Sequence, residues 1–598
     1  MPAGSVTQTR RTRLESVPPR ATDERGVVIV WLVILLVVLL GVTALALDVG
    51  YWRLTQTREQ RAADAAALAG AVTFPGDATQ ANAAALAIAG SNGYSVAAVT
   101  PVSAGASCPL GAGPTSVCTG AGTQPFQYKV TVTQTVHNMF GGIFGIGSTT
   151  VHASGTAEYL KPLSMGSPSN QFGNDPDATS WPIAAASPQY PNFWANIAGG
   201  NSVKENGDAY AADYCDIPTD GCSGIGSGAN LDYKANGYYY AVDFSGDATV
   251  NLQAFDPAFV DVGDFCTNNS TNNLLAASNL PAVPDYPQGN NPADWQKRYL
   301  PVGNQGNQQD PGYQYCTGDQ LFGSGPPPTT TYTVLKAKIP GDPGTAQPVC
   351  SVTYPGFSGD LAAALGTGFT VPGAPGPLAT YFRQWVNLCP VTGQTGDEYF
   401  IEVSTDRPSA GHNRFSLRAT AGSGPAPPVE IAGNAYMGIY ANVGGGQTSQ
   451  FYLARVPTAA AGHTLVLNFY DIGDASSTGS LQVVPPPDSN VGANFANCQW
   501  TGNSSTGALG YAANTPSAPW GPLSPIPNCE IDGVNGGGGT IWNAQWSTVT
   551  VPIPNNYTCN DSDPQGCWLK INYLFAGGVN DTTSWNAYLL GDPVRLVQ

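Results

Sequence analysis

The chain has 598 residues, of which only 11% are charged, with 72 Gly, 50 Pro and a formal net charge of −18. This length exceeds a single hydrophobic core and predicts about three to five domains. Many turn-forming residues together with 10% aromatics favour short strands over long soluble helices or a disordered chain. An acidic surface repels phosphate backbones, which excludes nucleic acid from the expected partners.

The first predicted element is a transmembrane helix over residues 27–47. This run contains no charged residue and no proline, and at about 1.5 Å per residue it spans about 31 Å, the thickness of a bilayer core. Arg25 and Trp31 lie near one end of the run, and Tyr51 and Trp52 follow the other end. Basic and aromatic residues prefer these positions at the two membrane interfaces, so the lipid bilayer is an expected partner.

The residues before the run predict the orientation of the helix. Residues 1–26 contain five Arg, so the positive-inside rule places them in the cytoplasm and places the chain after about residue 48 outside it. The alternative is a signal peptide cleaved after Ala46, because Ala44-Leu45-Ala46 has the A-x-A pattern. The run is longer than a usual signal-peptide core, which favours a permanent single-pass anchor in the cell membrane.

An Ala-rich helical stalk is predicted over residues 48–73, and Pro75-Gly76 ends it. Its small residues recur at helical spacing, as Ala62, Ala66 and Ala69 or as Ala63, Ala67 and Gly70. Small residues let two helices approach closely. The helix over 48–71 is therefore expected to pack either on partner subunits or on its own domain.

Several motifs in this region resemble one known family. They are Glu24-Arg25-Gly26, then Ala44-Leu45-Ala46-Leu47-Asp48-Val49-Gly50, then Gln60-Arg61-Ala62-Ala63-Asp64-Ala65-Ala66-Ala67-Leu68-Ala69-Gly70-Ala71, and finally Phe140-Gly141-Gly142-Ile143-Phe144-Gly145-Ile146 followed by Thr150 to Glu158. This order is similar to the TadG-like N-terminal module of the TadE/TadG proteins of Flp (tight-adherence) pilus assembly. The resemblance covers about residues 23–160.

The resemblance implies an integral membrane protein tied to pilus assembly or surface adherence, without catalysis. It also implies other Tad/Flp assembly proteins as partners, bound through the helix over 48–71. Type IV-like prepilins carry a glutamate five residues after the glycine that precedes the apolar run, whereas Trp31 stands five residues after Gly26. Cleavage by a prepilin peptidase is therefore not expected.

The rest of the chain is predicted to be mainly β. A small α+β unit is expected over 74–162, with a short helix at 80–89 and a strand at 126–133. β-rich domains are expected over 163–330, 331–486 and 487–598, divided by the triple prolines at 326–328 and 485–487. Their predicted strands are 238–244, 248–255, 399–403, 415–419, 465–469, 549–553 and 569–573. Ser245-Gly246-Asp247 predicts a hairpin between the first two strands, and the regular turn signals predict antiparallel sandwiches.

All twelve Cys lie beyond residue 107, and none has C-x2-C spacing. An even number of Cys in loop-like sequence favours disulfides in an oxidising compartment over metal ligation. The pairs nearest in sequence are Cys108 with Cys118, Cys215 with Cys222, and Cys559 with Cys567. The sequence does not define the connectivity.

Candidate sites for chemistry are few. Calcium is the one cofactor suggested, by Asp471 and Asp474 in a predicted loop, and less so by Asp256, Asp261 and Asp264. Asp in turns more often caps the backbone, so no cofactor is the simpler expectation. His412 is expected in a solvated turn. We expect no enzyme and no catalytic residue.

These features predict a membrane-anchored surface protein with a structural or adhesive role in or near Flp pilus assembly. The alternative is a surface protein that binds cell-wall or host glycans through aromatic side chains. Its candidate residues are Trp194, Trp500, Trp520, Trp542, Trp546, Trp568 and Trp585. An exported hydrolase is the third hypothesis.

Overall fold

The computed structural model describes residues 25–597, except for 75–77, 96–99, 102–107, 110–112, 123–126, 178–192, 217–218, 220, 223–227, 265, 267–297, 299–312, 423–425, 444–447, 473, 475–478, 503–523, 535–541, 576–578 and 591–593. The described chain forms two compact units. We call the first the stalk unit; it contains the residues up to Phe74, Ala78–Glu158 and the C-terminal segment from Val594. The second, the sandwich unit, extends over Tyr159–Pro593.

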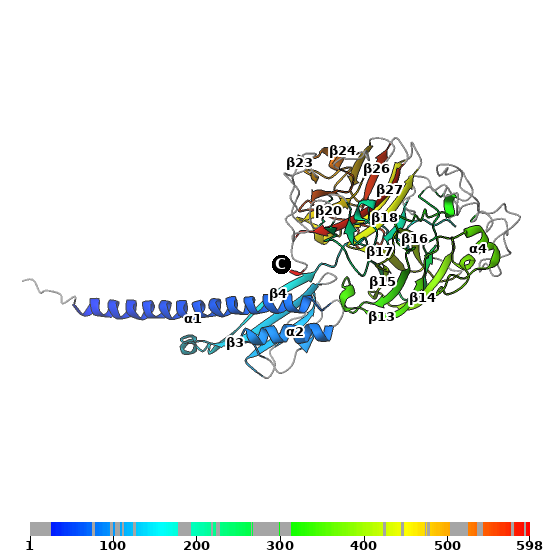
Figure 1. Cartoon of the computed structure of the whole chain (residues 1–598). Helices are drawn as coiled ribbons and strands as arrows, with labels where there is room; N and C mark the ends of the chain where they lie inside the picture. The colour runs from blue at the N-terminus through cyan, green and yellow to red at the C-terminus, as the bar shows by residue number, and fades with distance from the viewer. Residues whose placement is uncertain are drawn as a thin grey trace, which may run out of the picture. The chain divides into compact units, whose positions relative to one another are not determined.

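One long helix, α1 (Arg25–Ala71), begins the stalk unit. Its 47 residues include both the apolar run and the Ala-rich segment, and no proline interrupts them. The helix ends where the Gly70 carbonyl accepts hydrogen bonds from the N–H groups of Thr73 and Phe74, at 3.2 and 3.0 Å. The predicted membrane helix and stalk are therefore one continuous element (Figure 1).

The rest of the stalk unit is a short helix and a five-stranded sheet. The helix is α2 (Ala78–Ser91). The sheet order is β1-β2-β3-β4-β28, and its strands are β1 (Thr100–Pro101), β2 (Thr115–Ala121), β3 (Gln127–His137), β4 (Ser148–Tyr159) and β28 (Val594–Leu596). Strands β3 and β4 form a long hairpin whose turn contains the 3-10 helix η1 (Gly141–Phe144). The last strand therefore returns to the first unit of the chain.

The sandwich unit consists of two large antiparallel sheets. One sheet has the order β13-β12-β15-β10-β17-β5-β19-β26-β21-β24. Its strands are β13 (Gln347–Tyr354), β12 (Thr330–Lys336), β15 (Glu398–Thr405), β10 (Tyr238–Phe244), β17 (Val429–Asn434), β5 (Ser164–Met165), β19 (Thr448–Arg455), β26 (Trp568–Phe575), β21 (Gly479–Val484) and β24 (Glu530–Val534).

The other large sheet has the order β14-β11-β16-β7-β18-β27-β20-β25-β22-β23, with β6 also paired to β16. Its strands are β14 (Trp385–Gly393), β11 (Ala248–Phe255), β16 (His412–Thr420), β7 (Trp194–Ala198), β18 (Tyr436–Val443), β27 (Val579–Leu589), β20 (Thr464–Tyr470), β25 (Trp546–Pro552), β22 (Gln499–Gly502), β23 (Ser524–Pro525) and β6 (Gln171–Phe172). Among the smaller elements are the helix α4 (Leu361–Thr367) and the pair β8 (Tyr214–Cys215) and β9 (Gly228–Ala229). The mainly β, sandwich-like fold is confirmed.

The sheets divide at a different place from the predicted domains. Strand β17 belongs to the first large sheet and β18 to the second, and the single residue Ala435, at φ +68°, joins them. Strands before Ala435 fill one half of each sheet, and most strands after it fill the other half (Figure 1). The triple prolines at 326–328 and 485–487 lie in loops within these halves, because proline ends a strand without specifying which sheet comes next.

The predicted hairpin at residues 245–247 is wrong, although both of its strands are present. Strand β10 pairs with β15 and β17, whereas β11 pairs with β14 and β16 in the other sheet. The turn therefore carries the chain from one sheet to the other. One hydrophobic core fills the space between the sheets, and its members extend from Leu163 to Ala587.

Candidate functional site

The apolar part of α1 lies outside every hydrophobic core in the described residues. Its most apolar window has a mean hydropathy of 3.2 and no buried residue. Large side chains from Val27 to Leu47 are between 49% and 68% exposed. The helix is long and apolar enough to cross a membrane, and lipid is the solvent that such a surface requires. It is the one helix of this kind in the described part of the chain, which supports a single-pass membrane protein.

The predicted interface residues occupy different environments. Trp31 is 68% exposed and Tyr51 is 39% exposed on α1. Trp52 is partly buried, and its indole N–H donates a hydrogen bond to Oδ1 of Asn138 at 2.8 Å. Arg25 begins the helix, and its side chain is outside the described part of the chain.

Asp48, the first charged residue after the apolar run, is only 3% exposed. Its carboxylate accepts hydrogen bonds from three successive backbone N–H groups at the tip of the β3–β4 hairpin. The distances are 2.8 Å to Met139, 3.1 Å to Phe140 and 2.7 Å to Gly141. Successive N–H groups of this kind form an anion-binding concavity. The hairpin tip is thus fixed to α1 at the end of the membrane helix, a contact that no sequence motif predicts.

The small-residue face of α1 packs inside its own unit. Ala62, Ala63, Ala66 and Ala67 have no exposed surface and belong to the stalk-unit core with α2 and the sheet. The packing is so close that a Cβ on Gly70 would lie 2.1 Å from the Tyr128 ring. Of the two packing partners expected for this face, its own domain is the one observed.

Disulfides join all twelve cysteines, so the predicted disulfide-rich character is confirmed. The bridges are Cys108–Cys118, Cys215–Cys222, Cys266–Cys316, Cys350–Cys389, Cys498–Cys529 and Cys559–Cys567. All three pairs of sequence neighbours are bridged. Cys350 lies on β13 and Cys389 on β14, which are edge strands of the two different large sheets.

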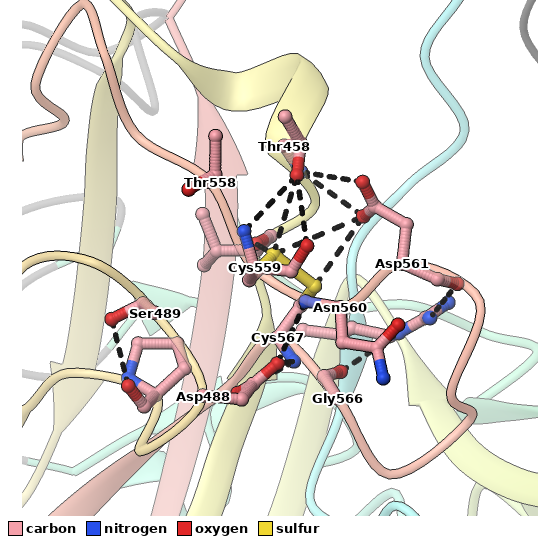
Figure 2. The surroundings of a disulfide bond; sticks show 12 residues. Thr458, Asp488, Ser489, Thr558, Cys559, Asn560, Asp561, Gly566 and Cys567 are labelled. Carbon is pink, nitrogen blue, oxygen red and sulfur yellow. Dashed lines mark hydrogen bonds between the residues drawn. A yellow bond between two sulfur atoms is a disulfide. The ribbon is translucent and has the colours of Figure 1, made fainter.

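One acidic and sulfur-rich group has ligand atoms close enough to suggest a metal site. Oxygen and sulfur atoms of Asp488, Cys559 and Cys567 lie within 4.8 Å of one another. Figure 2 shows, however, that the two sulfurs are joined in a disulfide and that Asp488 faces the backbone of the enclosed loop. The carboxylate accepts from the N–H of Asn560 at 2.8 Å and of Cys567 at 3.0 Å. The group stabilises a loop and offers no thiolate to a metal.

The calcium candidates are only partly arranged as a cation site. Asp471 is 2% exposed and accepts a hydrogen bond from the N–H of Ala544 at 2.5 Å, whereas Asp474 is exposed. Burial and the nearby Asp474 and Asp581 carboxylates raise the pKa of Asp471. Partial desolvation of its carboxylate and the nearby Asp264 raise the pKa of Asp474 to about 6. Calcium at this position remains a proposal.

In the second acidic group, protein groups engage the carboxylates of Asp256 and Asp264. Asp256 is 1% exposed and accepts hydrogen bonds from the Arg383 N–H and the Thr317 hydroxyl, at 2.8 and 2.9 Å. Asp264 forms an ion pair with Arg414 at 2.6 Å. These carboxylates hold loops and strands together.

Most of the tryptophans proposed for glycan binding are in the core. Trp568 and Trp585 are at most 1% exposed, and Trp194, Trp542 and Trp546 at most 7%. Trp500 is partly exposed and stacks on Trp542 with ring centroids 5.2 Å apart. Trp520 lies outside the described residues. Five of the seven candidate rings thus offer almost no surface to a sugar.

The expected solvated turn at His412 is wrong. His412 begins β16, has no exposed surface, and hydrogen-bonds to Asn196 through Nδ1 at 3.0 Å. Burial and the nearby Arg414 lower its pKa well below the usual value. Gly411, at φ +120°, makes the bend that the sequence suggested, and the ring then turns inward against Phe322.

A partly buried ionic cluster in the sandwich unit was not predicted. Glu398, Asp243 and Glu430 lie opposite one another on the adjacent strands β15, β10 and β17. Lys161 forms ion pairs with Asp243 at 2.8 Å and with Glu398 at 3.1 Å. The three carboxylates are separated by at least 32 residues in sequence, so only the strand register brings them together.

The pKa values of this cluster follow from burial and from one shared cation. Burial and the nearby Asp243 carboxylate together raise the pKa of Glu430 to about 8, against the opposing effect of Arg455 and Lys161. Burial likewise raises the pKa of Glu398 to about 8. Burial alone would raise the pKa of Asp243, but the ion pair with Lys161 lowers this pKa below its ordinary value. The cluster holds the chain segment at Lys161 on the sheet.

Together, these observations define a membrane-anchored protein with a disulfide-bridged, β-rich region beyond a single helix. Residues 26–73 match the family model of putative Flp pilus-assembly TadE/G-like proteins. Residues 26–73 are therefore TadE/G-like, as the motifs within them indicated. No curated protein and no solved structure matches the chain.

Proposed function

We propose that this protein is a TadG-like surface protein with a structural or adhesive role in or near Flp pilus assembly. The observation that carries the proposal is the match of residues 26–73 to the TadE/G-like family, on a helix whose apolar run is fully lipid-accessible. In this proposal α1 anchors the chain, and the sandwich unit is the part displayed to the surroundings.

The proposed orientation has residues 1–26 in the cytoplasm and the chain after about residue 48 outside it. Two features support this orientation. The basic arm precedes the apolar run, and the six disulfides all lie after it, in keeping with an oxidising compartment.

Cysteine accessibility in intact cells tests the orientation. Ser5→Cys should react with a membrane-impermeant maleimide only after permeabilisation, whereas Thr150→Cys, exposed on β4, should react without it. The reverse pattern would contradict the orientation. Carbonate extraction tests the anchor, because the full-length chain should stay in the membrane. A soluble mature protein beginning at Leu47 would establish the signal-peptide alternative.

Gene deletion tests the role in adherence. A strain that lacks the protein should lose surface attachment or assembled Flp-type filaments, and the full-length chain should restore both. Unchanged attachment and unchanged filaments would refute the proposal. Saturable binding of the purified protein to one glycan class, with intact filaments in the deletion strain, would instead favour the glycan-binding hypothesis.

A further inference from the structure

The tip of the β3–β4 hairpin exposes large apolar side chains beside the membrane helix. Met139, Ile143 and Ile146 are 66%, 79% and 56% exposed. Residues 138–147 contain no charged residue. A turn that faces water usually carries polar residues, and clustered exposed apolar side chains mark an interaction surface.

The hairpin extends along α1 toward the apolar run. Successive contacts between the two elements pair Gly70 with Tyr128, Ala63 with Gly155, Trp52 with Asn138 and Asp48 with Gly141. The order shows that β3 runs antiparallel to α1 and that the hairpin tip reaches the level at which the apolar run ends. Figure 1 shows the same arrangement, with the turn after β3 beside α1.

The tip is held at this level by a closed set of hydrogen bonds. The Ile146 N–H donates to the Gly141 carbonyl at 3.0 Å, and the Asn138 side chain donates to the Ile146 carbonyl at 2.9 Å. Gly145 takes φ +81°, which glycine adopts without strain and which lets the turn close. With Asp48 binding the N–H groups on the other side, Ile143 and Ile146 are carried on a fixed turn.

We propose that this tip is a second membrane contact, in which Met139, Ile143 and Ile146 insert into the lipid interface of the leaflet from which α1 emerges. The apolar surface of the tip continues that of the helix, because Asp48 directly follows Leu47, which is 53% exposed. Shallow insertion suits a short apolar element without charges. The proposal rests on α1 being the membrane anchor and is independent of a role in pilus assembly.

The consequence is that two points, instead of one, fix the stalk unit on the bilayer. A lone helix is free to rotate about its axis and to tilt within the limits of its apolar length. A lipid-inserted tip on one side of α1 restricts both motions. Asp48 then has a positioning role, since it sets the depth of the tip relative to the helix.

Depth-dependent fluorescence quenching tests the proposal on the full-length protein. Single cysteines replace Ile143, Ala121 or Leu36, and each is labelled with an environment-sensitive fluorophore without reductant, which leaves the native disulfides intact. The labelled proteins are reconstituted in phosphatidylcholine–phosphatidylglycerol vesicles that contain lipids with a spin label near the headgroup. Ala121 is the matched control, because it is exposed in the same sheet and pairs with Tyr128 at the opposite end of β3.

Several-fold stronger quenching at residue 143 than at residue 121 is the expected result. Quenching at Leu36 by lipids labelled deep in the acyl chain reports on the anchor separately. Equal quenching at 143 and 121, with Leu36 still quenched, would overturn the tip contact and leave the anchor standing. Loss of quenching at Leu36 would overturn both the tip contact and the membrane anchor.

A second copy of the chain is the competing occupant of the tip. In that case, the fluorescence at residue 143 would depend on the protein-to-lipid ratio and would not be quenched by the spin-labelled lipid. This outcome would also overturn the proposal. If Ile143→Cys does not fold, Ile146→Cys on the same turn gives the same comparison.

Discussion

Gly155 on β4 lies so close to Ala63 on α1 that a Cβ built on Gly155 would be 2.7 Å from the Ala63 carbonyl carbon. No real Cβ tolerates this distance to a backbone atom, so the hydrogen on Gly155 is what allows the helix to lie on the sheet. The contact explains why a glycine stands in the middle of a strand, where it otherwise costs stability.

Replacing Gly155 should therefore separate α1 from β4. We expect Gly155→Ala to lower the free energy of unfolding of the stalk unit by about 1–3 kcal/mol, the usual cost of overpacking. Gly147→Ala is the control, because a Cβ there would meet no atom within 4 Å. Thermal unfolding in detergent micelles measures the difference. Equal stability of the two variants would contradict the close approach.

Removing the Asp48 carboxylate should release the hairpin tip. Asp48→Ala removes the acceptor of three backbone N–H groups, and a hydrogen bond to a charged group contributes about 1.5–3 kcal/mol. Hydrogen exchange at Met139, Phe140 and Gly141 should accelerate strongly. Asp48→Asn keeps one oxygen and should give an intermediate rate. Unchanged protection in both variants would show that the tip is held by other contacts.

The native protein should contain no titratable thiol before reduction, since every cysteine is bridged. Thiol titration of unfolded protein should detect none without reductant and twelve after reduction. Zinc should bind the region of Cys559 and Cys567 only in the reduced sample, because cysteine ligates a metal as the thiolate and not as a disulfide. Several free thiols in unreduced protein exported from cells would refute these bridges.

The bridge between the two sheets should contribute more stability than the short-loop bridge. Cys350→Ser with Cys389→Ser opens a loop with a sequence separation of 39, compared with 8 for Cys559 and Cys567. Loop entropy predicts losses of about 4 and about 2.5 kcal/mol. Urea unfolding of the two double variants compares them directly. A larger loss for the short loop would contradict the prediction.

The two buried glutamates of the cluster at Lys161 predict a pH dependence of stability. Glu430 has a pKa raised to about 8 in the folded protein, against an ordinary value of 4.5. The stabilisation from its protonated form is complete below pH 4.5 and is lost as the pH rises to about 8. The slope for this one proton approaches about 1.4 kcal/mol per pH unit.

Glu430→Gln should flatten this slope, because glutamine has the shape of the protonated acid and does not titrate. Glu398, with a pKa also raised to about 8, would supply the remaining slope. Denaturant unfolding between pH 5 and 8 provides the measurement. Asp397→Asn is the control on a partly exposed carboxylate, 34% accessible. An identical slope for wild type and Glu430→Gln would mean that Glu430 is ionised in the folded protein.

Local features of the fold were predictable from the sequence, and pairings between distant segments were not. The apolar run predicted the membrane helix, and alternation predicted the strands at 399–403, 465–469 and 569–573, because both signals reside within a few neighbouring residues. Which strands pair depends on contacts such as Tyr238 with Val403. No periodicity encodes a contact over that separation, so the crossing at Ala435 was missed.

The same distinction holds for the sites. The Ala-rich motif predicted a close-packed helix but not which surface covers it, because spacing specifies a face and not its neighbour. Asp48 was visible as the residue that ends the apolar run, but the loop that it binds lies 91 residues further along the chain. The Glu398, Asp243 and Glu430 cluster left no sequence signal, since each acid alternates normally within its own strand.

The return of β28 to the sheet of the stalk unit has a mechanical consequence. The Val597 N–H donates to the Thr156 carbonyl at 2.9 Å, and Arg595 forms an ion pair with Glu158 at 3.3 Å. A pull on the sandwich unit is thus shared between two polypeptide tethers, one leaving β4 and one entering β28. A single protease cut in either tether would leave the sandwich unit attached through the other.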